Sequence, residues 1–118
     1  MKFHLDDFTR IAKKIRSDDA YNVYDFNFLN NLTVSMTHLH PGKNTKGHSH
    51  ENEDEVYIFL GESGEMQIGE ERFPVKGGDV VLVSKGKFHR VFNPNGSDDL
   101  RFFCVFEKYR KREKESKG

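Results

Sequence analysis

Three histidines and one carboxylate in this chain have side-chain types and spacings that suit a transition-metal site. His48 and His50 are separated by a single residue, Glu55 follows five positions later, and His89 lies far along the chain. Side chains at positions i and i+2 of a strand point to the same face, so His48 and His50 can reach one ion. Imidazole and carboxylate groups together suit Fe, Mn, Ni, Cu, Co or Zn better than Mg or Ca. We therefore predict one divalent transition metal, provided that the fold brings His89 to the pair.

The carboxylate ligand has two candidates, because four of the five residues from 51 to 55 are acidic. Glu55 fits best, since it opens the apolar run 56–60, which is typical of a strand. Asp54 is the alternative. In such a strand Tyr57 shares a face with Glu55, where it could hold substrate, relay a proton or simply belong to the core.

The two segments that hold these residues resemble the two characteristic motifs of the cupin superfamily. The first motif there is Gly, five residues, His-x-His, three or four residues, Glu, six residues and Gly. The second is Gly, five residues, Pro-x-Gly, two residues, His, three residues and Asn. The matching residues are Gly42, His48, His50 and Glu55 for the first motif, and Gly78, Gly86, His89 and Asn93 for the second.

The resemblance covers roughly residues 33–106 and departs from the family pattern at two places. Ser84 stands where the family usually has Pro, and the Gly after the carboxylate would fall at Glu62, between Gly61 and Gly64. Neither departure removes a proposed ligand. The resemblance implies an all-β fold, a small antiparallel double-stranded β-helix with a jelly-roll-like barrel.

Hydrophobic patterning agrees with that fold class. Short β-prone runs separated by turn signals predict strands near 21–28, 32–37, 56–60, 65–68, 71–75, 80–83, 88–92 and 100–106. Many short strands with close turns argue for a barrel or sandwich. Before them, apolar residues recur at helical spacing from Leu5 to Ile15 and predict a short N-terminal helix.

Composition indicates one small domain over residues 1–118, with its core at about 21–107 and a charged tail at 108–118. The 19 basic and 19 acidic side chains balance, so no attraction to nucleic acid or membrane is implied. Cys104 is the single cysteine, which excludes an internal disulfide and fits a reducing compartment. No stretch is apolar enough for a signal peptide or a membrane span, and we expect a cytoplasmic protein.

A narrower resemblance links the first motif to the cupin-type phosphoglucose isomerases of archaea. Those enzymes carry a Thr-x-Gly-His-x-His run, then Glu-Val-Tyr, then the histidine of the second motif. Here these are residues 45–50, residues 55–57 and His89. The resemblance implies that Thr45 and Gly47 help to bind a sugar phosphate. Arg90, which follows His89, could meet an anionic substrate or could be a solvated charge.

Two further histidines are candidates for the pocket. His38 and His40 alternate along a predicted strand and face the same way as Val34 and Met36. They could line the pocket, His38 toward substrate and His40 as an acid–base group. The alternative is that both lie outside the barrel or at a subunit contact.

Three functions fit these residues. The first is a metal-dependent isomerase acting on a small polar or anionic metabolite, with sugar phosphates favoured and with Glu55, Tyr57 or His40 moving the proton. The alternatives are a metal-dependent dioxygenase and a non-catalytic module that binds a small molecule. Apolar residues on both sides of the run 56–60 also predict a homodimer, unless the N-terminal segment covers that face.

Overall fold

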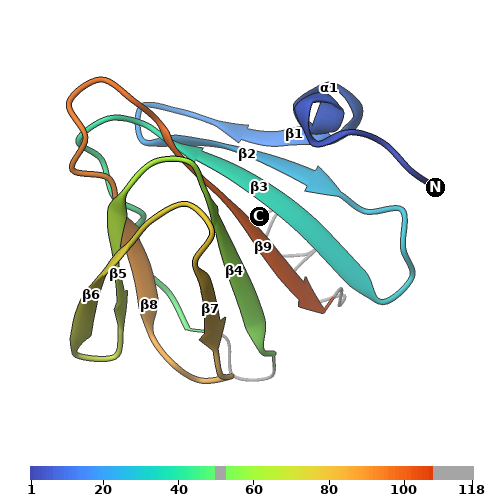
Figure 1. Cartoon of the computed structure of the whole chain (residues 1–118). Coiled ribbons are helices and arrows are strands. Elements are labelled where there is room, and N and C mark those ends of the chain that lie inside the picture. Colours follow the sequence, from blue (N-terminus) through green and yellow to red (C-terminus); the bar gives the residue numbers. More distant parts are fainter. Residues whose placement is uncertain (50–52, 108–118) are drawn as a thin grey trace.

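The computed structural model describes residues 1–49 and 53–107, and in this part of the chain nine strands form two antiparallel sheets that face each other (Figure 1). The larger sheet has the strand order β1-β2-β3-β9-β4-β7, and the smaller has the order β6-β5-β8. The expected all-β double-stranded β-helix is thereby confirmed. Within these described ranges, no helix has the length and apolarity that crossing a lipid bilayer would require.

The strand bounds follow the predicted runs closely. In chain order the strands are β1 (Lys13–Ser17), β2 (Tyr21–Phe26), β3 (Leu32–Leu39), β4 (Glu55–Leu60), β5 (Gly64–Ile68), β6 (Glu71–Val75), β7 (Val80–Val83), β8 (His89–Phe92) and β9 (Leu100–Glu107). Strand β2 ends two residues earlier than predicted, and β3 continues two residues further.

The N-terminal helix is shorter than predicted, and the prediction is wrong for its second half. A 3-10 turn at Leu5–Asp7 leads into α1 (Phe8–Ile11), and Ala12 is already extended, with φ −70° and ψ 160°. The next residues, including Ile15, form β1 and pair antiparallel with β2. The free edge of β2 offers a row of backbone hydrogen bonds, and pairing along it outweighs the weak propensity of a short isolated helix.

The turn between β1 and β2 is fixed by Asp18. Its carboxylate accepts the backbone N–H groups of Ala20 and Tyr21 at 2.8 and 3.1 Å and the Arg16 Nε–H at 2.6 Å. The hydrogen bond from Tyr21, followed by those from Arg16 and Ala20, lowers the pKa of Asp18 to about 2. These hydrogen bonds close the hairpin of β1 and β2. Its first strand was predicted as helix because its apolar residues also fit a helical period.

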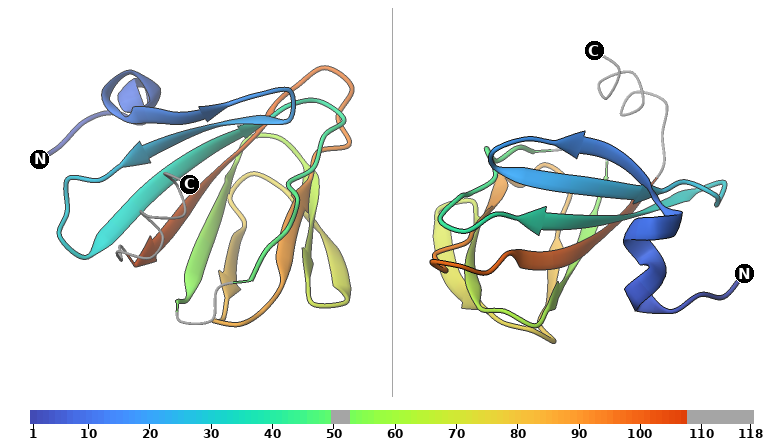
Figure 2. Two further views of the ribbon diagram at one scale, coloured as in Figure 1. Left: turned by 180° about the vertical axis from the view of Figure 1, so that it is seen from behind. Right: turned by 90° about the horizontal axis from the view of Figure 1, so that it is seen from above.

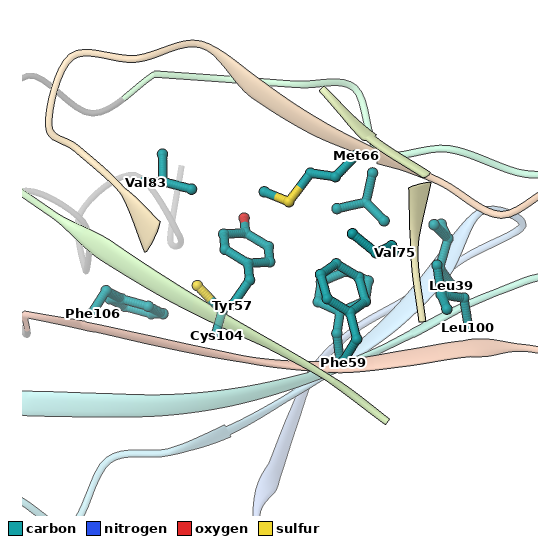
Figure 3. Packing of buried hydrophobic residues seen from close by; sticks show 11 residues of the cluster. Leu39, Tyr57, Phe59, Met66, Val75, Val83, Leu100, Cys104 and Phe106 are labelled. Carbon is teal, nitrogen blue, oxygen red and sulfur yellow. The ribbon is translucent and has the colours of Figure 1, made fainter. Parts of the chain in front are cut away.

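The core lies between the two sheets. Buried and less buried residues alternate along β4 and β9, as expected for strands with one face toward a core. In Figure 3, Leu39 and Leu100 lie at one end of the cluster, Phe59 and Tyr57 lie in the middle, and Phe106 lies at the other end.

A second apolar cluster lies on the outer face of the large sheet. The N-terminal segment packs there, with the Phe8 ring 5.1 Å from Phe103 and 5.8 Å from Phe26, and Phe3 stacked on Phe26 at 4.9 Å. Figure 2 shows α1 on the side of this sheet that faces away from the small sheet. Strands β3 and β9 are therefore covered on both faces.

Candidate metal centre

The chain between β3 and β4 runs alongside β8 and carries the first candidate ligand to the third. Asn93 N–H donates to the Lys43 carbonyl at 2.8 Å, and Thr45 N–H donates to the Val91 carbonyl at 2.9 Å. Further along, His48 and His89 exchange two backbone hydrogen bonds of 3.1 and 2.9 Å. This pairing places their rings 4.5 Å apart, at an interplanar angle of 74°.

Strand β4 supplies the carboxylate. Glu55 is its first residue and is opposite Val83 of β7 and Phe106 of β9. Its Oε2 atom lies 2.7 Å from Nε2 of His89, and both side chains are buried. One ligand atom each from His48, Glu55 and His89 lie within 4.8 Å of one another. The fold thus gathers three of the four predicted ligands from three separate segments.

The contacts of His89 leave room for either a metal ion or a proton between it and Glu55. The Nδ1 atom of His89 is 2.9 Å from the Lys87 carbonyl, which can only accept, so Nδ1 carries the hydrogen. When the ring is neutral, its Nε2 atom presents a lone pair to the carboxylate of Glu55. Two acceptors 2.7 Å apart require a proton or a metal ion to attract both.

The donor set fits a transition-metal ion. Two ligands each about 2.0–2.2 Å from one ion are themselves separated by about 3 Å, close to the distance between Glu55 and His89. Orienting a ligand histidine through a backbone carbonyl, as Lys87 does for His89, is typical of metal centres. His48 is exposed, so the group is open to solvent on one side.

Two points of the predicted ligand set remain, namely His50 and the choice between Asp54 and Glu55. His50 lies outside the described residues, so its role as a ligand stays a prediction. Asp54 is exposed and accepts the Lys85 N–H at 2.9 Å, which turns its carboxylate to a surface loop. Glu55 is therefore the carboxylate that joins the two histidines.

Thr45 and Gly47 shape the segment that carries His48. The Thr45 hydroxyl oxygen accepts the Val91 N–H at 3.0 Å and so takes the place of a backbone carbonyl in the ladder with β8. Gly47 has φ +87°, and a Cβ atom there would lie 2.4 Å from Cζ of Phe88. A side chain at Gly47 would therefore push the Phe88 ring aside and leave the backbone in a strained conformation. Their predicted contact with a sugar phosphate stays a prediction.

Asn93, the last residue of the second motif, stabilises the fold at the other end of the barrel. Its side-chain amide donates to the Leu39 carbonyl at 2.8 Å and to the Asp98 carbonyl at 2.9 Å. Its side-chain oxygen accepts the Asn95 N–H at 3.0 Å. These bonds tie the loop after β8 to the end of β3.

His38 and His40 lie away from the three ligands. Nε2 of His38 is 3.2 Å from Sδ of Met36, on the outer face of the large sheet, and Nδ1 of His40 is 3.2 Å from Oδ1 of Asp99. Leu39, between them, pairs with Leu100, whereas Glu55 pairs with Phe106 six residues further along β9. At about 3.4 Å per residue, roughly 20 Å of strand separate the two places.

Burial lowers the pKa of His38, and Arg101 and His40 act in the same direction against Asp99 and Glu62. Arg90 is also directed outward, since its neighbours His89 and Val91 are buried and its guanidinium carbon lies 4.9 Å from the Phe92 ring. The structure does not bring His38, His40 or Arg90 to the ligand group.

Tyr57 lies one step further into the barrel than Glu55. It is buried, and its ring meets that of His89 edge-on at 5.6 Å. Figure 3 shows its hydroxyl directed away from β4, into the space between the sheets. Tyr57 is thus the nearest inward neighbour of Glu55 on its own strand and shares its face, as the alternation predicted.

Sequence reasoning missed the polar lining on β3. Thr33 and Ser35 are buried and are opposite Phe106 and Cys104, so they face the space between the sheets. The apolar residues that alternate with them face outward, toward the N-terminal segment. Glu53 is also buried, just before β4. Alternation marks two faces but does not say which one is inside, and no other signal in the sequence identified these residues.

The fold and the ligand group define a double-stranded β-helix with a histidine and carboxylate centre at one end of the barrel. Residues 35–106 match the family model of the cupin domain, so the chain belongs to the cupin superfamily. No curated protein sequence matches the chain.

Solved structures agree on the fold. A double-stranded β-helix protein from Klebsiella pneumoniae has a TM-score of 0.74 and 21% identity, over 90% of this chain and 88% of that one. The TT1209 protein from Thermus thermophilus has a TM-score of 0.74 and 23% identity, over 91% and 97%. A sugar phosphate isomerase from Silicibacter pomeroyi has a TM-score of 0.70 and 18% identity, over 77% of this chain and 61% of that one.

Proposed function

We propose that this protein is a metal-dependent enzyme that acts on a small polar or anionic metabolite, with sugar-phosphate isomerisation as its reaction. The observation that carries the proposal is the convergence of His48, Glu55 and His89 at one end of the barrel. The buried pair Glu55 and His89 has a geometry that suits two ligands of one ion.

The charge of the site favours an anionic substrate. A divalent ion held by neutral imidazoles and a single carboxylate keeps a net positive charge, which attracts phosphate or carboxylate groups. When bound, the ion supplies a Lewis acid that polarises the oxygens of a sugar in its open-chain form. His48, Glu55 and His89 would hold that ion, and the hydrogen bond to the Lys87 carbonyl would keep the His89 ring in the required tautomer.

Tyr57 is the residue we assign to proton movement. Its ring packs against that of His89, and its hydroxyl points into the space between the sheets. Interconversion of an aldose and a ketose moves one proton from C2 to C1 and one from O2 to O1, and it needs no oxidant or reductant. A phenol beside the ligands can take a proton from one of these substrate oxygens while it gives its own proton to the other.

One sequence similarity supports this substrate class. Residues 45–50 and 55–57 share the Thr-x-Gly-His-x-His and Glu-Val-Tyr runs of the archaeal phosphoglucose isomerases. The Silicibacter pomeroyi protein with the same fold is a sugar phosphate isomerase. Its low identity of 18% supports the fold alone, so the substrate class rests on the site and the motif.

The test is an assay of the full chain loaded separately with Fe(II), Mn(II), Ni(II) and Zn(II), under nitrogen, on a panel of aldose and ketose phosphates. We expect interconversion that is lost in His89→Ala and reduced at least about tenfold in Tyr57→Phe, with metal content unchanged in Tyr57→Phe. No interconversion under nitrogen, together with oxygen uptake in air, would indicate a dioxygenase instead. Tight ligand binding without turnover would indicate a binding module.

A further inference from the structure

The ladder between β8 and the ligand segment, which we define as residues 43–48, contains one extra residue. Asn44 is opposite Phe92, and His48 is opposite His89. Between these two pairs the ligand segment has three residues, 45–47, whereas β8 has two, 90 and 91. An extra residue on one strand of an antiparallel pair is a β-bulge.

Two further observations place the bulge next to Gly47. The Val91 N–H donates to the Thr45 hydroxyl at 3.0 Å, where a regular ladder would use the Thr45 carbonyl. The regular pattern of hydrogen bonds is therefore interrupted at Thr45. Gly47 follows two residues later with φ +87°, in the left-handed region that glycine adopts readily and that one type of bulge requires.

The bulge decides which way His48 points. Residues directly opposite each other in an antiparallel ladder have their side chains on the same face. A regular ladder continuing from Asn44 would set Gly47 opposite His89. His48, the next residue, would then point to the outer face, because a shift of one residue reverses the faces. The extra residue instead sets His48 opposite the buried His89, with the two rings 4.5 Å apart.

We propose that Gly47 is a positioning residue of the metal centre, because its left-handed conformation holds the bulge that turns His48 toward His89 and Glu55. This inference rests on the proposed metal-dependent function, since it concerns a ligand of the ion. Gly47 acts here through its backbone conformation and needs no contact with substrate. Bulges are common next to functional sites, where they re-aim a side chain in this manner.

The space at Gly47 is a separate requirement from its conformation. A Cβ atom there would lie 2.4 Å from Cζ and 2.8 Å from Cε2 of Phe88, whose side chain is 38% exposed. The far end of a partly exposed ring can turn aside. The left-handed conformation, by contrast, costs most other residues free energy, and a β-branched residue most of all. A substitution at Gly47 should therefore favour the regular ladder even where the ring gives way.

The test measures the affinity of the full chain for Co(II) and the visible absorption of the bound ion, which reports its ligands. Gly47→Val should raise the Kd at least about tenfold, since valine favours the ladder in which His48 points outward. Deletion of Lys46 from the Gly47→Val variant should restore most of the lost affinity and the wild-type spectrum. Without the extra residue, a regular ladder sets His48 opposite its partner histidine, and valine suits a strand.

Gly96→Val is the matched control. Gly96 is exposed in the loop between β8 and β9, and a side chain there would meet open space within the described part of the chain. Its substitution should leave the Co(II) affinity unchanged. Deletion of Lys46 alone should also leave the affinity close to that of the wild type, because glycine accepts the regular ladder as well.

An unchanged Kd in Gly47→Val would overturn the proposal. A further loss of affinity on deletion of Lys46 would overturn it too, and so would full recovery on addition of Phe88→Ala, because both would show that Gly47 supplies space alone. Sugar-phosphate turnover is assayed separately. The expected Co(II) results without turnover would support this inference and reject the isomerase, whereas turnover with an unchanged Kd in Gly47→Val would reject only this inference.

Near-ultraviolet circular dichroism checks that each variant is folded. Should Gly47→Val fail to fold, Gly47→Ala with and without the deletion of Lys46 gives the same comparison. Alanine also avoids the left-handed region but places fewer atoms against the Phe88 ring. Recovery of affinity on deletion of Lys46 is again the expected result, and a further loss would contradict the proposal.

Discussion

The two ends of the space between the sheets differ sharply in chemistry although the same strands build both. At one end, Leu39, Phe59 and Leu100 are at most 1% exposed and carry no polar side-chain atom. At the other end, Glu55 and His89 are buried just as deeply and lie 2.7 Å apart. On the inner face of β4, only Tyr57 lies between Glu55 and Phe59. Figure 3 shows the apolar side chains along this space, from Leu100 at one end through Phe59 and Tyr57 to Phe106 at the other.

The polar end is held in place by the apolar end. Burying a carboxylate and an imidazole opposes folding unless a cation or hydrogen bonds compensate, so that end contributes little free energy of folding by itself. The apolar end contributes most of it, since each large side chain buried there is worth about 1.5–3 kcal/mol. The apolar end therefore fixes the strands on which the ligands are mounted.

Among the variants that test this difference between the two ends, Phe59→Ala should lower stability the most. Phe59 is 1% exposed, so the substitution should lower the free energy of unfolding by about 3–5 kcal/mol. Urea unfolding of metal-free protein at fixed concentration measures it. Phe28→Ala is the control, since Phe28 is 65% exposed, and it should cost less than about 1 kcal/mol. Equal losses of unfolding free energy in the two variants would contradict the claim that the apolar end stabilises the fold more than the surface does.

Glu55→Gln should weaken metal binding strongly but change stability little. The amide keeps the size of the side chain but removes the charge, so metal affinity should fall at least about 100-fold. The free energy of unfolding of the metal-free protein should change by less than about 1.5 kcal/mol, because a buried charge is replaced by a neutral isostere. Metal titration and urea unfolding of the same samples give both numbers. A loss of stability as large as that of Phe59→Ala would show that Glu55 belongs to the stabilising core.

Thr45→Val tests the connection between the ligand segment and β8. The substitution removes the acceptor of the Val91 N–H and should cost about 1–3 kcal/mol of stability. Because that bond lies three residues from His48, metal affinity should also weaken, whereas Thr45→Ser should retain both properties. If Thr45→Ser fails as completely as Thr45→Val, the hydroxyl is not what matters.

The smallest effect concerns the histidine that lies outside the barrel. Burial lowers the pKa of His38, so protonation favours the unfolded state, in which histidine titrates at about 6.5. Stability should therefore fall as the pH drops below about 6.5, and His38→Asn should make that fall shallower in metal-free protein. Chemical unfolding at a series of pH values measures the slopes. Identical slopes for both proteins would contradict the assignment.

Much of the barrel was predictable from the sequence because β4 to β9 combine alternating patterns with glycine-bearing turns. The N-terminal segment was not, since Ile15 fits a helical period and a strand equally well. Its structure is decided by the free edge of β2 and by the Asp18 turn, which are tertiary and local features that periodicity does not contain.

The candidate site was predictable where the residues match the cupin motifs. The resemblance to the two cupin motifs anticipated the approach of His48 to His89, and the start of an apolar run anticipated Glu55 over Asp54. The outward direction of His38 was not predictable, because a period of two does not distinguish the inner face from the outer. On β3 the inner face carries Thr33 and Ser35, and the outer face is the more apolar one.

The most direct test of the account is the metal content of extensively dialysed wild-type protein and of His89→Ala, measured by inductively coupled plasma mass spectrometry. His89 is a buried ligand candidate that contacts Glu55, so removal of its imidazole should abolish metal binding by the group. We predict one equivalent of a divalent transition metal per wild-type chain and less than about a tenth of an equivalent in His89→Ala. A full equivalent retained by His89→Ala would contradict the assignment of this end of the barrel as the metal centre.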